Sequence, residues 1–364
     1  MALNHTVLRN PIPLTILTGF LGAGKTTLLN RILNGDHGLK IAVMVNDFGT
    51  INIDSQLVVD VSADDTINLS NGCICCTIRG DLLEATQSLV NRNDPPDYII
   101  IETSGVSDPL EVALTFRYMP QVEIDSVLTI VDSSEILDVA PEHKVLAMNQ
   151  IGMADILILN KVDLVNAETL QAVRHYARKI MPSTRLLETT HAHVPLELML
   201  NVGNFSAERF MSREPGDVHV HTAAELASDG HAHDHDHAHV HDDHTLIFST
   251  WSWETDQPIS MKALQRTMEQ LPLSIYRAKG IFFLADSPDS QAVLQVVGKR
   301  INLNLDGEKW GDRPLRSQCV FIGTVDGIDA DALQAQMDAC LASNVPASDA
   351  HQLATAALRW LRRK

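Results

Sequence analysis

Residues 19–26 read GFLGAGKT and could hold the phosphates of a nucleotide. They match the spacing G-x-x-x-x-G-K-[ST], with an apolar run (14–18) before them and a helical run after them, as this motif requires. Glycines let backbone N–H groups turn toward the phosphates, and the following helix presents its positive end to them. Lys25 would reach the β and γ phosphates, and the Thr26 hydroxyl would ligate Mg²⁺. The expected binding residues here are Gly19, Gly22, Ala23, Gly24, Lys25, Thr26 and Thr27.

A second phosphate-side element is expected at 98–105, which reads YIIIETSG. An apolar strand that ends in an acid would place Glu102 near the Mg²⁺ shell, or where it orients the attacking water. The amide of Gly105, three residues on, could touch the γ phosphate. The alternative interpretation is a plain buried strand with a polar exit.

Base recognition is indicated at 160–163, which reads NKVD after the apolar run DILIL. Asn-Lys-x-Asp at a strand end is the arrangement with which G proteins read guanine. The Asp163 carboxylate can accept from guanine N1–H and N2–H₂, a pattern that adenine lacks, and the Lys161 stem can lie along the base. A surface turn is the alternative for Asn160, Lys161 and Asp163. Together with the phosphate motif, these residues predict a GTPase that binds GTP and GDP.

The segment 71–76, NGCICC, predicts a metal site. Its thiolates, Cys73, Cys75 and Cys76, can converge on one soft ion, and Zn²⁺ fits thiolate and imidazole best, while Co²⁺ and Ni²⁺ stay open. Three sulfurs leave a fourth position for a histidine, a carboxylate or water, which suits a site that releases its metal. Buried or simply reduced thiols are the alternative, and this is the expectation for Cys319 and Cys340, which fall in a predicted strand and helix.

A second metal-binding region is predicted from histidine content. Of 16 histidines, nine fall between 219 and 244, and 228–244 reads SDGHAHDHDHAHVHDDH. Such a tract cannot bury a core, and we expect a metal-capture arm or, alternatively, a solvated linker that binds metal incidentally. The candidate ligands are His231, His233, His235, His237, His239, His241 and His244.

Composition excludes several classes of protein. Asp plus Glu number 46 against 28 Lys plus Arg, a net charge of −18, which argues against nucleic-acid binding. No apolar run reaches the ~18–20 residues of a membrane span, and the N-terminus shows no secretory signal. Three crowded cysteines make a poor disulfide framework, so a reduced cytoplasmic location is expected.

The elements that must position these residues alternate between strand and helix. Continuous apolar runs at 14–18, 40–46, 98–103, 126–132, 155–160 and 185–189 are typical of parallel strands buried on both faces. The segments between them can hold crossover helices, so 1–211 is expected to be an α/β, doubly wound P-loop domain. A flexible His/Asp-rich linker is expected at 212–244.

A smaller α+β domain with a ferredoxin-like core is expected at 245–345. Strands are predicted at 246–253, 275–285, 292–305 (with turns) and 318–324, and helices at 260–271 and 329–341, with Ser260 as a cap. An amphipathic surface helix is expected within 346–364.

Taken together, these motifs resemble the CobW-type metal-handling G proteins, relatives of the hydrogenase and urease nickel-insertion factors. The resemblance rests on GFLGAGKTT, NDFG, IDSQLV, NGCICC, ETSGVSDP, NKVDL, the His-rich linker and WGDRP, and it spans nearly the whole chain. It implies a GTPase metallochaperone with a Cys-x-Cys-Cys metal site and a CobW C-terminal domain. The family usually has acids flanking Asn-x-Phe-Gly. Val45 and Thr50 stand in two of these places, and Asp47 is the acid that remains. The resemblance implies a switch loop here whose acid assists the metal or Mg²⁺, and GTP with Mg²⁺ is expected to order the loops at Asp47 and Glu102.

The partner we expect is a client metalloprotein of unidentified type, with homodimer formation left open. The N-terminal Cys-Pro docking motif of the methionine-aminopeptidase zinc chaperones is missing, so that client is not favoured. A metal storage protein and an accessory factor for cobalt insertion in corrin synthesis are the alternative functions.

Overall fold

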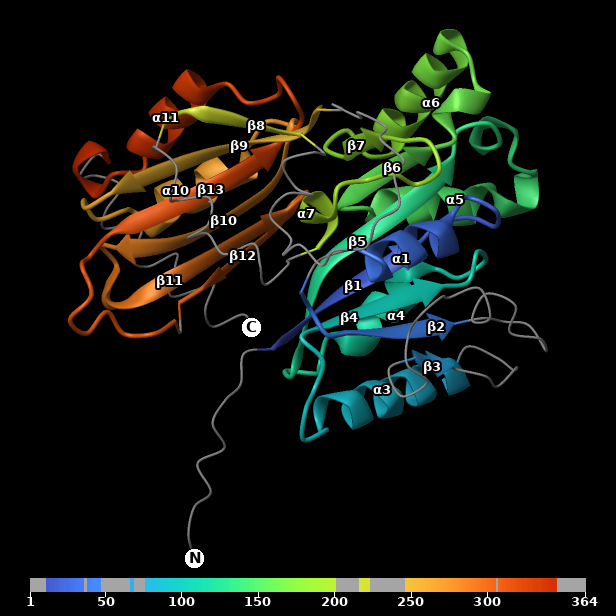
Figure 1. Cartoon of the computed structure of the whole chain (residues 1–364), viewed down its shortest axis with the longest axis horizontal. Coiled ribbons are helices and arrows are strands. Elements are labelled where there is room, and N and C mark those ends of the chain that lie inside the picture. The colour runs from blue at the N-terminus through green and yellow to red at the C-terminus, as the bar shows by residue number, and fades with distance from the viewer. Residues whose placement is uncertain are drawn as a thin grey trace, which may run out of the picture. The chain divides into compact units, whose positions relative to one another are not determined.

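The chain forms two compact units, residues Met1–Gly203 and Asn204–Lys364. The structure is a computed structural model that describes residues 11–35, 38–46, 66–68, 76–200, 216–222, 246–305 and 307–345. Each unit contains one sheet, and the two sheets differ in strand direction (Figure 1).

The first unit contains a seven-stranded sheet in the order β3-β2-β4-β1-β5-β6-β7, in which every pair of neighbouring strands is parallel. Its strands are β1 (Ile12–Thr18), β2 (Ile41–Asn46), β3 (Thr66–Asn68), β4 (Tyr98–Thr103), β5 (Val122–Asp132), β6 (Ile156–Asn160) and β7 (Arg185–Glu188). The predicted doubly wound α/β fold is therefore confirmed, with boundaries that shift by a few residues. The short strand β3 was not predicted, because three residues carry no readable periodicity.

Helices connect these strands, as parallel neighbours require. They are α1 (Lys25–Leu33), α3 (Cys76–Val90), α4 (Pro109–Phe116), α5 (Pro141–Met153) and α6 (Ala167–Ile180), with 3₁₀ turns η1 (Ile136–Asp138) and η2 (Val162–Leu164), and the short α7 (Leu196–Met199) follows the last strand, β7. Side chains cap two of them, since Asp108 accepts from the amide of Leu110 at the start of α4 and Asn166 accepts from that of Thr169 at the start of α6.

The apolar pattern of the strands places the core against these helices. Leu14 and Ile16 of β1 pack in one cluster with residues of α3 and α4, including Leu82 and Phe116. A second cluster joins β5 and β6 to α5 and α6. Buried packing on this scale holds the carboxyl ends of the strands, where the polar motifs lie, in fixed positions.

The second unit contains an antiparallel sheet in the order β12-β11-β10-β13-β9-β8. Its elements are β8 (Val218–Thr222), β9 (Leu246–Thr255), α10 (Met261–Glu269), β10 (Ile275–Leu284), β11 (Ser287–Val297), β12 (Arg300–Asn304), β13 (Ser317–Gly323), α11 (Ala330–Asp338) and η3 (Ala342–Asn344). Strand β13 lies between β9 and β10, which α10 connects, so the unit contains a split β-α-β as expected of a ferredoxin-like core.

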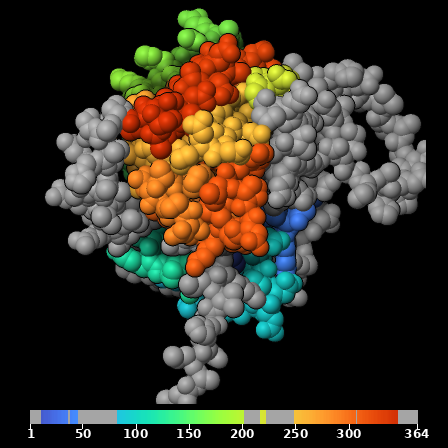
Figure 2. All heavy atoms as spheres, turned by 90° about the vertical axis from the view of Figure 1, so that its left-hand side faces the viewer, coloured from blue at the N-terminus to red at the C-terminus, as the bar shows by residue number. Residues whose placement is uncertain are grey.

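The helices of this unit cover one apolar face of the sheet. Trp251, Phe282 and Phe321 pack in one cluster with Leu264 of α10 and Met337 of α11, and Figure 2 shows the red α11 against the gold-to-orange residues around α10. Cys319 and Cys340 belong to the same cluster and are buried, as the sequence predicted. Burial raises the pKa of both thiols, so neither is prone to act as a thiolate.

The sequence analysis placed 218–222 in a flexible linker, and the structure corrects this. These residues read VHVHT and form β8, which pairs with β9. The strand forms because β-branched residues, which favour strands, alternate with histidines that face inward. The His221 ring stacks on Phe248 with a centroid distance of 4.7 Å, and its Nε2 lies 2.9 Å from Thr250 Oγ1. The rest of that linker and the helix expected within 346–364 lie outside the described residues. Within the described part of the chain, no helix has the length and apolar character needed to cross a membrane.

Candidate functional site

The phosphate-binding motif forms a turn between β1 and α1, as expected. Lys25 is the first residue of α1 and is only 7% exposed. Its Nζ donates hydrogen bonds to the carbonyl oxygens of Gly19 at 3.0 Å and Phe20 at 3.2 Å. The ammonium group therefore lies inside the curve of the loop, where it can meet phosphate oxygens at the N-terminus of the helix.

The glycine at position 24, which caps α1 with φ of 109°, has a steric reason. A Cβ at this position would lie 2.5 Å from Nδ2 of Asn160. Only glycine permits this approach, which lets Asn160 donate a hydrogen bond of 2.8 Å to the carbonyl of Ala23. The predicted base-reading segment thus holds the predicted phosphate loop directly.

The acid at the end of β4 lies beside the loop as well. Thr26 Oγ1 donates to Glu102 Oε1 at 3.0 Å, and Glu102 is 2% exposed. A hydroxyl and a carboxylate supply hard oxygen ligands, which are the donors that Mg²⁺ prefers. Thr26 and Glu102 would therefore hold a Mg²⁺ ion, which would supply positive charge beside the nucleotide phosphates.

Lys161 is held by an acid that the sequence analysis did not single out. Its Nζ lies 2.6 Å from Oδ2 of Asp132 at the end of β5, while Asp132 Oδ1 accepts from the Ser134 amide and hydroxyl. Burial alone would raise the pKa of Asp132, but the hydrogen bonds from Lys161 and Ser134 and the charge of Lys161 outweigh it and lower that pKa. The aspartate stays ionised and holds the Lys161 side chain in place. The backbone of Lys161 has a positive φ of 59°. Asp163, in η2, is exposed and accessible to a base.

A loop at 189–193 lies against the base-reading segment, and the sequence analysis did not single it out. The Ala192 amide donates to Asn160 Oδ1 at 2.9 Å, and Arg31 Nε of α1 donates to the His191 carbonyl at 2.8 Å. His191 and Ala192 both have positive φ, which residues other than glycine rarely adopt. The two hydrogen bonds therefore hold a strained stretch of backbone. The sequence signal was weak, because TTHAH resembles an ordinary polar turn.

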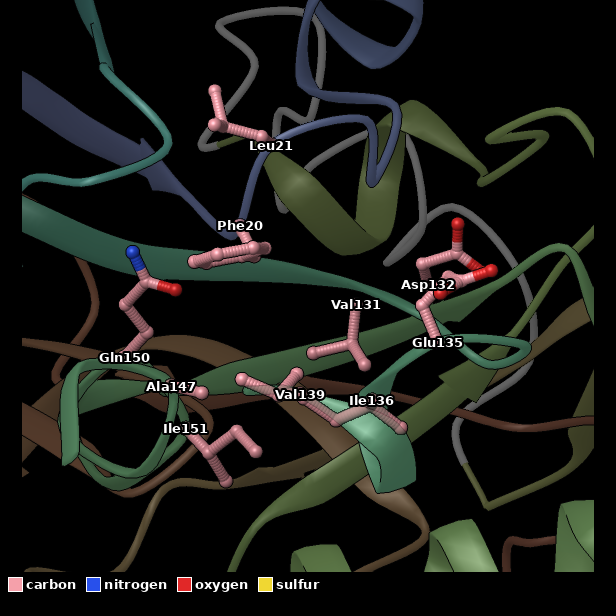
Figure 3. A pocket seen from close by; sticks show the side chains of 10 residues that line it. All are labelled: Phe20, Leu21, Val131, Asp132, Glu135, Ile136, Val139, Ala147, Gln150 and Ile151. Atoms are coloured by element: carbon pink, nitrogen blue, oxygen red, sulfur yellow. The ribbon is translucent and has the colours of Figure 1, made fainter. Parts of the chain in front are cut away.

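A small cavity of about 20 Å³ lies beside the phosphate loop. Figure 3 shows Phe20 and Leu21 from the loop, Asp132 at the end of β5, Glu135 just before η1, and Gln150 from α5 around it. The space is about that of one water molecule, so it cannot receive a nucleotide base. The cavity lies between the phosphate loop and α5, which also contact each other directly.

The predicted metal ligands are not part of this geometry. Asp47, Cys73, Cys75 and all seven tract histidines lie outside the described residues, and Cys76 is described only as the first residue of α3. Among the residues that are described, no group of three or more His, Cys, Asp or Glu side chains could hold a metal ion. Of the predicted site residues, the structure brings together Lys25, Thr26, Glu102, Asn160 and Lys161 with the glycines of the loop.

Comparison with known proteins agrees with this arrangement. Residues 13–188 match the family model described as CobW/HypB/UreG, nucleotide-binding domain, and 248–341 match the cobalamin synthesis protein cobW C-terminal domain. The zinc chaperone YjiA of Escherichia coli is 32% identical, with 86% of this chain and 94% of that protein aligned. A zinc-regulated GTPase metalloprotein activator 1 of Dictyostelium discoideum is 29% identical over 91% of this chain and 80% of that protein.

Among solved structures, Zn(II)-bound YjiA GTPase from E. coli matches with 26% identity and a TM-score of 0.41, covering 91% of this chain and 99% of that one. The two family models follow each other along the chain in the same order as the two compact units. The chain therefore belongs to the CobW family, with a CobW/HypB/UreG nucleotide-binding domain followed by a CobW C-terminal domain.

Proposed function

We propose that this protein is a GTP-hydrolysing metallochaperone that binds a transition metal, foremost Zn²⁺, and delivers it to a client metalloprotein under control of the bound nucleotide. The names of its relatives, zinc chaperone and zinc-regulated GTPase metalloprotein activator, support both halves of this function. It works in the cytoplasm, where its crowded thiols stay reduced.

The observation that carries the nucleotide half is the convergence of three separate segments. Asn160 at the end of β6 bonds to the phosphate loop at Ala23, and Thr26 of that loop bonds to Glu102 at the end of β4. A chance glycine-rich turn would not be tied to both partners.

Each group has a role in hydrolysis. Lys25 neutralises the β and γ phosphates, and the Gly105 amide contacts the γ phosphate. Thr26 and Glu102 would hold Mg²⁺, which would supply positive charge to the phosphate oxygens, and Glu102 and Asp47 would position the attacking water. Asp163 accepts from guanine N–H groups, while Lys161, fixed by Asp132, lies along the base.

The metal half rests on the chemistry of the cysteines and histidines. Cys73, Cys75 and Cys76 form the transfer site, and the histidine tract from His231 to His244 forms a weaker capture arm. Co²⁺ and Ni²⁺ are accepted by the same donors, so the ion delivered depends on availability as well as affinity. The GTPase domain is assigned to 1–211, and the C-terminal domain to 218–345, because β8 belongs to its sheet.

The test is to measure metal affinity and nucleotide affinity on one sample. Zn²⁺ affinity of the full chain is titrated against a chelator with GDP and with a non-hydrolysable GTP analogue, and analogue affinity is measured with and without Zn²⁺. Linkage requires that the nucleotide changes the Zn²⁺ affinity by the same factor by which Zn²⁺ changes the nucleotide affinity. We expect this factor to differ from one. A storage protein would give a factor of one, and hydrolysis of ATP as fast as GTP would contradict the guanine assignment. Sedimentation of the same samples tests the homodimer.

A further inference from the structure

The loop that follows β4, residues 104–108, is a compact turn between β4 and α4. The Ser107 amide donates to the Ser104 carbonyl at 3.1 Å, and the hydroxyls of these two serines lie 2.9 Å apart. Both serines are buried, and Asp108 at the end of the loop caps α4. These bonds hold the turn together and join it directly to the start of α4.

One side of this turn lies against the phosphate loop. A Cβ on Gly105 would lie 2.6 Å from the backbone nitrogen of Leu21 and 2.6 Å from its Cδ2. Only a glycine tolerates backbone at that distance, so the residue proposed to meet the γ phosphate is in direct contact with the loop that holds the phosphates.

The other side of the turn is held by a glutamine of α5. Gln150 Nε2 donates to the carbonyl oxygens of Ser107 at 3.2 Å and Gly105 at 3.3 Å. The side chain is 2% exposed, and because both neighbours are carbonyl acceptors, the amide nitrogen must face them. The backbone carbonyl of Gln150 in turn accepts from Thr129 of β5 at 2.8 Å, which fixes this point of the helix to the sheet.

Helix α5 contacts the phosphate loop independently. The rings of Phe20 and His143 lie with centroids 5.3 Å apart, and Ala147, Gln150 and Ile151 face Phe20 across the small cavity (Figure 3). The turn at 104–108 therefore lies between two structures, the loop and α5, that also touch each other.

We propose that Gln150 is a positioning residue that fixes the Gly105 amide relative to the γ phosphate. It also transmits any displacement of Gly105 to α5. This inference rests on the proposed GTPase function. A γ phosphate that draws Gly105 toward itself must stretch or realign the two Gln150 bonds, so the protein distinguishes GTP from GDP partly through this side chain. Gln150 acts through Gly105 and does not itself touch the nucleotide.

The test compares Gln150→Met, which keeps the length of the side chain but removes both donors, with Gln171→Met on the exposed face of α6. Affinities for GDP and for a non-hydrolysable GTP analogue with Mg²⁺ are measured, together with kcat and KM for GTP. We expect Gln150→Met to lose about tenfold in analogue affinity and in kcat, since loss of one or two hydrogen bonds has an effect of this size. GDP affinity should stay within about twofold, and Gln171→Met should match the wild type in every measurement.

A purely structural glutamine would give a different result, because GDP and analogue affinity would fall together with the melting temperature. That outcome, or an unchanged ratio of analogue affinity to GDP affinity in Gln150→Met, overturns the inference. Should Gln150→Met not fold, hydrogen exchange of the wild type tests the inference without a variant. Hydrogen exchange of the wild type adds an independent readout: 105–107 and 147–151 should gain protection together when the analogue replaces GDP, and separate changes would contradict the coupling. Failure of the wild type to bind either nucleotide would instead overturn the GTPase proposal itself.

Discussion

At the scale of single residues, the site depends on one buried cation. Lys25 is almost fully buried in the phosphate loop, where its Nζ hydrogen-bonds to the carbonyls of Gly19 and Phe20. Lys25→Ala should therefore reduce GTP hydrolysis by at least about 100-fold, because the charge on the β and γ phosphates is left uncompensated. Single-turnover hydrolysis measures this. Turnover within a few-fold of the wild type would contradict the phosphate assignment, and Lys25→Arg tests whether charge alone suffices.

A second residue-scale prediction concerns Asp132. Its pKa is lowered in the folded state, so its contribution to stability is fully present above the ordinary value of about 3.9 and is lost as the pH falls through the folded pKa. Asp132→Asn should lower the free energy of unfolding by about 1.5–3 kcal/mol at pH 7, the range of a charge-assisted hydrogen bond.

Denaturant titrations from pH 7 to pH 3 measure this difference, which should stay constant down to about pH 5 and shrink below pH 4. Asp94 provides a matched control. Its pKa is also lowered, by Lys40, but its side chain is 87% exposed, so Asp94→Asn should leave stability unchanged. A difference for Asp132→Asn that grows as the pH falls would show that the sign is wrong.

At the scale of elements, Asn160 joins three segments that are far apart in the chain. Its amide donates to Ala23 after β1 and accepts from Ala192 after β7, and the side chain is 2% exposed. Asn160→Ala should cost about 1–3 kcal/mol for each backbone group left without this partner, and it should weaken GTP and GDP binding together.

A control for this substitution exists on α6. Asn166→Ala removes a helix cap from the same domain and should cost about 1 kcal/mol while nucleotide affinity stays the same. Chemical denaturation and nucleotide titration on both variants separate the two roles. Equal nucleotide affinities for Asn160→Ala and wild type would show that the bridge does not shape the site.

Elements also show where sequence-based prediction ends. The parallel strands and the motif residues at their ends could be predicted, because continuous apolar runs and fixed spacings are local signals. The partners of those residues could not: Asp132 with Lys161, Ala192 with Asn160, and Gln150 with loop 104–108 are contacts between segments whose spacing follows no period. Strand β8 was missed for a related reason, since its alternating residues are Val and His rather than apolar and charged.

At the scale of the whole molecule, the two predicted metal regions fall in different units. The thiol motif, 71–76, belongs to the nucleotide-binding unit and ends at the start of α3, while the histidine tract belongs to the second unit, between β8 and β9. Because β8 and β9 pair with each other, the tract connects two strands of one hairpin. Removing 230–244 leaves 223–229 and 245 to close that hairpin, so the sheet should survive the deletion.

This separation makes the two metal sites independently testable. The three cysteines should hold one ion tightly, whereas the tract should hold several ions weakly, since ordering a polar, low-complexity segment on binding costs free energy. Deletion of 230–244 should lower the number of bound Zn²⁺ ions while one tight site and basal GTP hydrolysis remain. Changing Cys73, Cys75 and Cys76 to serine should remove the tight site and any metal-stimulated hydrolysis, while weak capacity survives. Competition against a zinc-sensitive chelator measures both variants, and loss of the tight site with the deletion but not with the serines would invert the assignment.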